Sequence, residues 1–188
     1  MTQRINIKKY LATYSSLIST DAVEKNVRVF AERIAGTKKN GGKLILAGNG
    51  ASASIASHIA TDFTKQAGVR AITFNEANLI TALSNDCGFE NWIAKAVDLY
   101  ADPHDLLILI SSSGTSANVV KAALRAREKK IAVVALTGFA ADNTLGKLAN
   151  LHLWVDSRAY NIVECTHMIW LTAVCDLLIG QAEYGVKG

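Results

Sequence analysis

Two clusters of glycine and hydroxyl residues have the composition of an anion-binding site. The first is Gly48–Ser54, which separates the apolar run Leu44–Ala47 from a segment of good helix formers. The second is Ser111–Ser116, which follows the apolar run Leu106–Ile110. The first-turn amides of a helix lack intrahelical partners, and the helix dipole favours negative charge beside them. Strand, turn and helix in this order therefore predict a site where amides and hydroxyls hold an anion such as a phosphate monoester.

Titratable groups follow the first cluster on the same segment. His58 and Asp62 are spaced i,i+4, so a helix would place both on one face. An anion site followed by a histidine–carboxylate pair suits both ligand binding and proton transfer. Either cluster alone has a simpler explanation, because serine and threonine are common helix caps and Gly-Asn-Gly is a common tight turn.

Nucleotide binding is the weakest interpretation of these clusters. Gly48, Gly50 and Ala53 fit the spacing of a dinucleotide fingerprint, but its acidic residue would be Glu76, which comes a little late. The second cluster has no role in that scheme. The pattern GxxxxGK[ST], typical of ATPases, is absent from the sequence.

Short apolar runs that alternate with helix-like segments predict an α/β fold with a five-stranded parallel sheet. The expected strands are 44–47, 71–74, 106–110, 131–136 and 151–155. The expected helices are 5–20, 21–39, the segment after Gly50, 77–100 in two pieces divided at Ser84–Gly88, 117–130, a stretch before the last strand, and 160–182. In the flavodoxin-like strand order 2-1-3-4-5, ligands bind where the first and third strands diverge. The two hydroxyl clusters follow these two strands.

Length and composition narrow the class of protein. The 188 residues predict one domain over 1–188, with N-terminal helices at 1–40, an α/β core at 41–158 and a C-terminal helix at 159–182. The net charge of +4 is scattered, which argues against direct nucleic-acid binding. Three cysteines without a CxxC pair, and an N-terminus without a signal-peptide core, indicate a cytoplasmic protein. The longest apolar run, 168–179, is too short to span a bilayer, so no membrane association is expected.

Oligomerisation is expected from the same composition. Half of the residues are hydrophobic, and the mean hydropathy of +0.19 is high for a soluble monomer of this size. The last helix is apolar over too much of its circumference for the surface of a monomer. We therefore expect other subunits to cover it.

Four segments resemble the sugar isomerase (SIS) domain family: GNGASASIASHIATDF, ALSNDCGFENWIAKAV, DLLILISSSGTSANVVKAA and IAVVALTG. The nearest branch contains the phosphoheptose isomerases and their relative, the initiator-associating protein of bacterial replication. The resemblance covers essentially the whole chain. It implies a three-layer α/β sandwich with added N-terminal helices, assembled as a homotetramer whose sites are shared between subunits.

The resemblance also implies roles for individual residues. It assigns the phosphate to the loop after the third strand, and other sugar or phosphate contacts to the first cluster and to the Ser-Asn-Asp motif. The implied binding residues are Asn49, Gly50, Ser52, Asp86, Ser111, Ser112, Ser113 and Ser116. His58 matches a helix histidine that lies near the site.

The proton-transfer residues depart from the family pattern. Family isomerases carry H-x3-E on the first helix, whereas this chain has His58 and Asp62. On the last helix they carry Q-x2-H-x4-H. One alignment places Glu164, His167 and Thr172 at those positions, and the other places Val163 and Leu171 at the first and the last. Either way the second, catalytic histidine is missing, and threonine cannot shuttle protons near neutral pH as histidine does.

Two functions of different kinds follow from this pattern. The leading one is a ketose–aldose isomerase for sedoheptulose 7-phosphate or a related sugar phosphate, with Asp62 as the catalytic base and His58 or Glu164 assisting. The alternative is a non-catalytic protein that binds sugar phosphates or other proteins. No cofactor is required, although some family members hold a metal at positions matching His58, Asp62 and Glu164, which would here suit zinc with three ligands. A hydrogen-bonded cluster without metal is the favoured alternative.

Overall fold

The computed structural model describes residues 5–182. Its centre is a five-stranded, all-parallel sheet in the order β2-β1-β3-β4-β5, as predicted. The strands are β1 (Leu44–Gly48), β2 (Ala71–Thr73), β3 (Leu106–Ser111), β4 (Ala132–Thr137) and β5 (Leu151–Trp154). In the register, Gly48 at the end of β1 pairs with Ile110 at the end of β3. The loops after these two strands therefore start beside each other.

Helices cover both faces of the sheet, because alternate residues of each central strand point to opposite sides. Leu44 and Leu46 of β1 join a core with α2 (Asp21–Lys39), α3 (Ala51–Lys65) and α8 (Tyr160–Ile179). Ile45 and Ala47 join a second core. That core packs against α4 (Ala77–Cys87), α5 (Trp92–Tyr100), α6 (Ala117–Glu128) and α7 (Thr144–Leu148). Two packed cores on a parallel sheet make the three layers predicted from the sequence.

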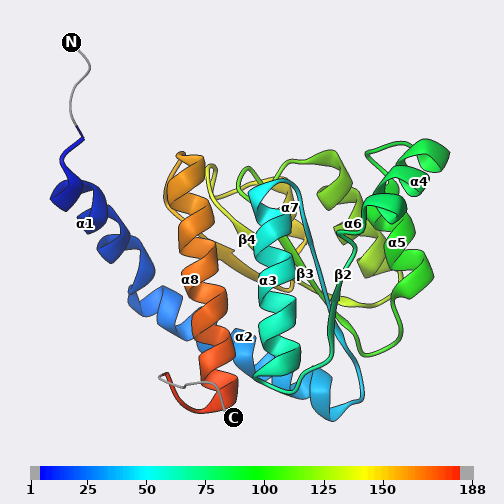
Figure 1. The fold of residues 1–188 in the computed structure, drawn as a ribbon, viewed down its shortest axis with the longest axis horizontal. Coiled ribbons are helices and arrows are strands. Elements are labelled where there is room, and N and C mark those ends of the chain that lie inside the picture. The colour runs from blue at the N-terminus through cyan, green and yellow to red at the C-terminus, as the bar shows by residue number, and fades with distance from the viewer. Residues whose placement is uncertain (1–4, 183–188) are drawn as a thin grey trace.

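The two N-terminal helices follow one another past α8, the first at the outer left of Figure 1 and the second behind α8. α1 (Ile7–Ile18) begins at Asn6, whose side chain accepts a hydrogen bond from Lys9 N, and α2 begins at Thr20, which caps Val23 N. α2 packs on α8 and β5, whereas α1 has no buried residue and projects away from the sheet. Ile7 and Leu11 of α1 are consequently exposed.

Several predicted boundaries were wrong by a few residues. The segment 77–100 does divide into two helices, but α4 continues through Ser84–Cys87 and stops at Gly88, whose φ of 85° favours glycine. α8 ends at Ile179 and not at 182, because Gly180 adopts a left-handed conformation and closes the helix. β2 and β5 are each one residue shorter than predicted, and β4 is displaced by one residue.

α8 is the one helix among residues 5–182 that is long and apolar enough to cross a membrane. About half of its apolar window (44%) is buried within the fold. Its neighbours are α2, α3 and α1. This packing is typical of a core helix that passes the same test of length and composition.

Candidate functional site

A small cavity of about 100 Å³ lies where the loops after β1 and β3 meet the start of α8. Seven of the residues predicted from the sequence line it, from three separate segments of the chain. They are Asn49, Ser52, Ser111, Ser112, Ser113, Ser116 and Glu164, and Tyr160 joins them. The strand order alone explains why the two loops meet, since β1 and β3 are neighbours.

The turn after β1 depends on two glycines. A Cβ at Gly48 would lie 2.7 Å from Ser52 Cβ and 2.8 Å from the carbonyl oxygen of Ile110, so only glycine fits between the strand and α3. Gly50 has a φ of 54°, which starts α3 without a side-chain cap. Gly50, which was predicted as a binding residue, does not itself line the cavity. The turn buries Ser52, which is 3% exposed, against the cavity.

The loop after β3 is held by the segment that follows the neighbouring strand, β4. Gly114 has a φ of 65°, and its amide donates to the carbonyl oxygen of Ser111. A Cβ at Gly114 would lie 2.1 Å from Asn143 Oδ1. Asn143 is itself buried, and its Nδ2 donates to Thr137 Oγ1 at 2.8 Å. The loop is therefore preorganised before any ligand binds.

The cavity is lined by neutral donors and one carboxyl group. Ser112 Oγ is buried and has no hydrogen-bond partner among the described residues. Ser111 Oγ lies 3.5 Å from Ser116 Oγ, at the limit of hydrogen bonding. Hydroxyls without protein partners suit a tetrahedral anion, because each can donate one charge-assisted hydrogen bond. Glu164 carries the one carboxyl group of this lining, and its negative charge would repel a phosphate placed against it.

The histidine–carboxylate pair forms on α3 as predicted. His58 Nε2 lies 3.2 Å from Asp62 Oδ2, with the imidazole 60% and the carboxylate 23% exposed. Neither residue lines the cavity. They lie roughly 9 and 15 Å along the helix from Ser52, at a rise of about 1.5 Å per residue.

Asp62 lies near Cys175 of α8. Burial, together with the nearby carboxylates of Asp62 and Asp176, raises the pKa of the Cys175 thiol to about 11. Cys175 is therefore a neutral thiol in the α3–α8 interface. The carboxylate of Asp62 lies at this same interface, farther along the two helices than the cavity.

The α8 positions that match the family histidine are not titratable in either alignment. Leu171 is fully buried, and Thr172 Oγ1 donates to the carbonyl oxygen of Met168 at 3.0 Å. His167 is completely buried, with Nε2 3.1 Å from the carbonyl oxygen of Thr137. Desolvation lowers the pKa of His167 to about 4, so its imidazole is neutral and outside the cavity.

Two predicted groupings are not assembled within one chain. Asp86 is exposed near the end of α4, where Asn85 Nδ2 donates to it at 3.1 Å, and it does not line the cavity. Among residues 5–182, no three His, Cys, Asp or Glu side chains form a group that could hold a metal. The three-ligand set of His58, Asp62 and Glu164 is therefore reduced to the pair on α3.

Three residues near the site were missed by sequence reasoning. Tyr160 lies one helical turn before Glu164 and packs edge-to-face on Phe139, with ring centroids 4.9 Å apart. This i,i+4 spacing was a signal that could have identified it. Asn118 hydrogen-bonds the side chain of Asn49, and Asn143 supports Gly114. Nothing in the sequence distinguishes these two asparagines from others.

Known proteins share both this sequence pattern and this fold. Residues 9–138 match the SIS domain family. A phosphoheptose isomerase from Roseiflexus sp. is 38% identical over 154 residues, covering 79% of this chain and 78% of that protein. One from Methylibium petroleiphilum is 32% identical over 177 residues, with 88% of each chain covered.

Solved structures of phosphoheptose isomerases share the fold of this chain. A phosphoheptose isomerase from Neisseria gonorrhoeae, 30% identical, superposes with a TM-score of 0.77 over 82% of this chain and 86% of that one. One from Francisella tularensis, 26% identical, gives a TM-score of 0.83 over 95% of this chain and 100% of that one. The chain therefore belongs to the SIS domain family, in the branch of the phosphoheptose isomerases.

Proposed function

We propose that the chain is a ketose–aldose isomerase for a sugar phosphate of the sedoheptulose 7-phosphate type. The observation that carries the proposal is the cavity at the ends of β1 and β3, which is lined by Ser52, Ser111, Ser112, Ser113 and Ser116. Its relatives among the phosphoheptose isomerases support the same chemistry. The non-catalytic alternative is not favoured by these relatives.

The phosphate group would bind the loop Ser111–Ser116, and the sugar would extend from the cavity over the surface of α3 that carries His58 and Asp62. Isomerisation moves a proton from the carbon beside the carbonyl group, through an enediol, to the former carbonyl carbon. Asp62 is the base that takes and returns this proton. Proton transfer at the oxygen atoms of the sugar falls to His58 or to Glu164. His58 Nε2 lies 3.2 Å from Asp62 Oδ2.

Asp62 suits the role of base better than Glu164 for an electrostatic reason. A phosphate in the cavity would lie against Glu164, and the two negative charges would repel each other. Asp62 does not line the cavity, so a bound phosphate would repel it less. One carbon of the sugar is oxidised while its neighbour is reduced, so the reaction requires no cofactor.

The remaining parts of the proposal concern the assembled oligomer. We assign Asp86 to a site that is completed when subunits meet, because the residue is exposed and distant from the cavity of its own chain. A homotetramer in the cytoplasm, with no role for nucleic acid or membrane, completes the proposal. Zinc at the α3 pair would need ligands beyond His58 and Asp62.

The direct test is turnover of purified protein on sedoheptulose 7-phosphate, with fructose 6-phosphate and ribulose 5-phosphate as comparison substrates. Aldose formation is followed by NMR, with and without a chelator. We expect slow conversion of the heptose phosphate that the chelator does not change. Binding of all three sugars without conversion of any would refute the isomerase assignment.

A further inference from the structure

The cavity at the ends of β1 and β3, the serine cavity, is open to solvent on one side. Its volume of about 100 Å³ is below the range of sites that enclose a whole small molecule, so a sugar phosphate would place only its phosphate end inside. Tyr160 is 61% exposed, whereas the other seven lining residues are buried or half-buried. The carbon chain of such a ligand therefore leaves the cavity at its rim, and Tyr160 is the exposed residue of this rim.

The ring of Tyr160 is supported from one side by Phe139. The two rings pack edge-to-face, with their centroids 4.9 Å apart and their planes at 70°. An edge-to-face pair is favourable beyond the area that it buries, so this contact restricts the positions of an otherwise exposed ring. Phe139 follows the end of β4, so a segment outside α8 determines how Tyr160 lies against the cavity.

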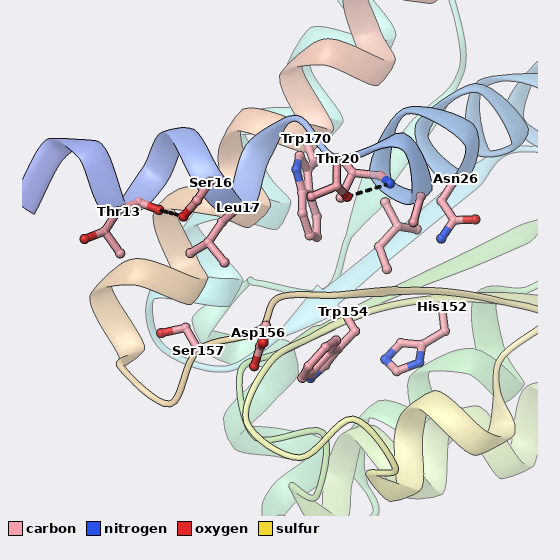
Figure 2. Close-up of a pocket in the computed structure, with 13 residues that line it drawn as sticks. Thr13, Ser16, Leu17, Thr20, Asn26, His152, Trp154, Asp156, Ser157 and Trp170 are labelled. Carbon is pink, nitrogen blue, oxygen red and sulfur yellow. Dashed lines mark hydrogen bonds between the residues drawn. The ribbon is translucent and has the colours of Figure 1, made fainter.

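Phe139 has an unusual backbone conformation. Its φ is 57°, in the left-handed region that a bulky residue rarely adopts. Phe139 N donates to the carbonyl oxygen of Ser157 at 2.8 Å, and Ser157 Oγ accepts from Ala159 N, just before α8, at 3.2 Å. Figure 2 shows Ser157 in the loop between β5 and α8, where it also lines a second cavity beside α1. Conformations of this kind persist where surrounding contacts enforce them, and they cluster at binding sites.

The residue before Phe139 connects the same segment to the phosphate loop. Gly138 N donates to the carbonyl oxygen of Ser112 at 2.9 Å. A Cβ at Gly138 would lie 2.5 Å from Val163 Cγ2, so the end of β4 packs directly against α8. Gly138 and Phe139 thus connect the loop that lines the cavity to the first turn of α8, which carries Tyr160.

We propose that Tyr160 is a specificity-determining residue whose ring contacts the carbon atoms next to the bound phosphate group, and that Phe139 positions this ring. The inference rests on the proposed function, because it concerns the same cavity. An aromatic ring offers an apolar surface to the C–H groups of a sugar chain, and inorganic phosphate has no such groups. Tyr160 therefore distinguishes a sugar phosphate from the free anion.

The test compares the affinities of the intact protein for sedoheptulose 7-phosphate and for inorganic phosphate, measured by calorimetry. Tyr160→Ala should weaken binding of the sugar phosphate about tenfold and binding of inorganic phosphate less than about twofold. Tyr160→Phe keeps the ring, so both affinities should stay within about threefold of those of the parent protein. The matched control is Tyr100→Ala, which removes another exposed tyrosine, packed on Phe74 outside the cavity, and should change neither affinity.

Phe139→Gly tests the positioning role, because glycine adopts a φ of 57° without strain and the variant should fold. It should weaken binding of the sugar phosphate, whereas Phe139→Tyr keeps an aromatic ring and should retain the affinity of the parent protein. In the Tyr160→Ala protein, Phe139→Gly should cause no further loss, because Phe139 acts through the ring of Tyr160. A residue with a merely structural role would cause the same loss in both backgrounds.

The inference is overturned if Tyr160→Ala changes the two affinities by the same factor, or if the losses in the double variant add. It is also overturned if Tyr160→Phe loses as much as Tyr160→Ala, since the hydroxyl group would then be the contact. A parent protein that does not bind sedoheptulose 7-phosphate would contradict it as well. Failure of the isomerase assignment looks different: the sugar phosphate binds but is not converted, and the affinities still decide the role of Tyr160.

Discussion

Asn49 and Asn118 exchange two hydrogen bonds through their side-chain amides. Asn49 Nδ2 donates to Asn118 Oδ1 at 3.0 Å, and Asn118 Nδ2 donates to Asn49 Oδ1 at 2.8 Å. The pair joins the turn after β1 to the first turn of α6. It therefore fixes the distance between the two loops that line the serine cavity.

Asn118→Ala should destabilise the protein by about 1–3 kcal/mol, because it leaves the half-buried amide of Asn49 without a partner. It should also weaken phosphate binding, since the two loops lose their connection. Denaturant unfolding measures the first effect. In a double-mutant cycle, removing both amides should cost little more than removing one. Additive losses would show that the pair carries no coupling.

Ser112→Ala should weaken binding of inorganic phosphate or a sugar phosphate about tenfold, because it removes a donor from a desolvated anion site. Stability should not fall, since Ser112 Oγ has no partner among the described residues to lose. Calorimetry measures the affinity. Ser54→Ala is the matched control, because Ser54 is exposed on α3 and lies outside the cavity. Equal affinities of the two variants would place the phosphate elsewhere.

The fold was predictable where the residue pattern of a segment also determines the place of that segment in the sheet. The apolar runs that became β1 and β3 end in glycine and serine, so both the strand order and the meeting of the two loops followed from the sequence. The residues that support these two loops could not be predicted in this way. Asn118 and Asn143 act through contacts with residues 69 and 29 positions away, and asparagine has no periodicity that reveals such a contact. The nearness of Asp62 to Cys175 likewise depends on how α3 packs on α8.

Stability should fall between about pH 6.5 and pH 4 because of His167. The pKa of this buried histidine is lowered to about 4 in the folded state, against about 6.5 in the unfolded chain. The unfolded state thus binds more protons in this range, and folding loses stability as the pH falls. The full loss is about 3 kcal/mol.

His167→Gln should flatten this pH dependence, because glutamine stays neutral at every pH in the range. The free energy of unfolding at several pH values measures the slope. His104→Gln is the control, since His104 is exposed and should leave the slope as in the parent protein. An unchanged slope in the His167 variant would show that this residue is not the source.

The exposed apolar residues of α8 predict assembly. Ile169 and Leu177, 41% and 43% exposed, are two turns apart on one face of the helix. Ile169→Asp should reduce the tetramer that we expect by light scattering to smaller species. Leu99→Asp changes an exposed leucine on α5 and should leave the assembly intact. A wild-type protein that is monomeric at micromolar concentration would contradict this account.

The most direct measurement is exchange of the substrate proton during isomerisation in deuterium oxide. If Asp62 takes a proton from carbon to form an enediol, deuterium should enter the carbon next to the carbonyl group as sedoheptulose 7-phosphate is slowly converted. NMR detects this incorporation. Asp62→Asn should abolish both conversion and incorporation while leaving phosphate affinity unchanged. Conversion that is as fast as in the relatives and insensitive to Asp62→Asn would contradict the assignment of Asp62 as the base.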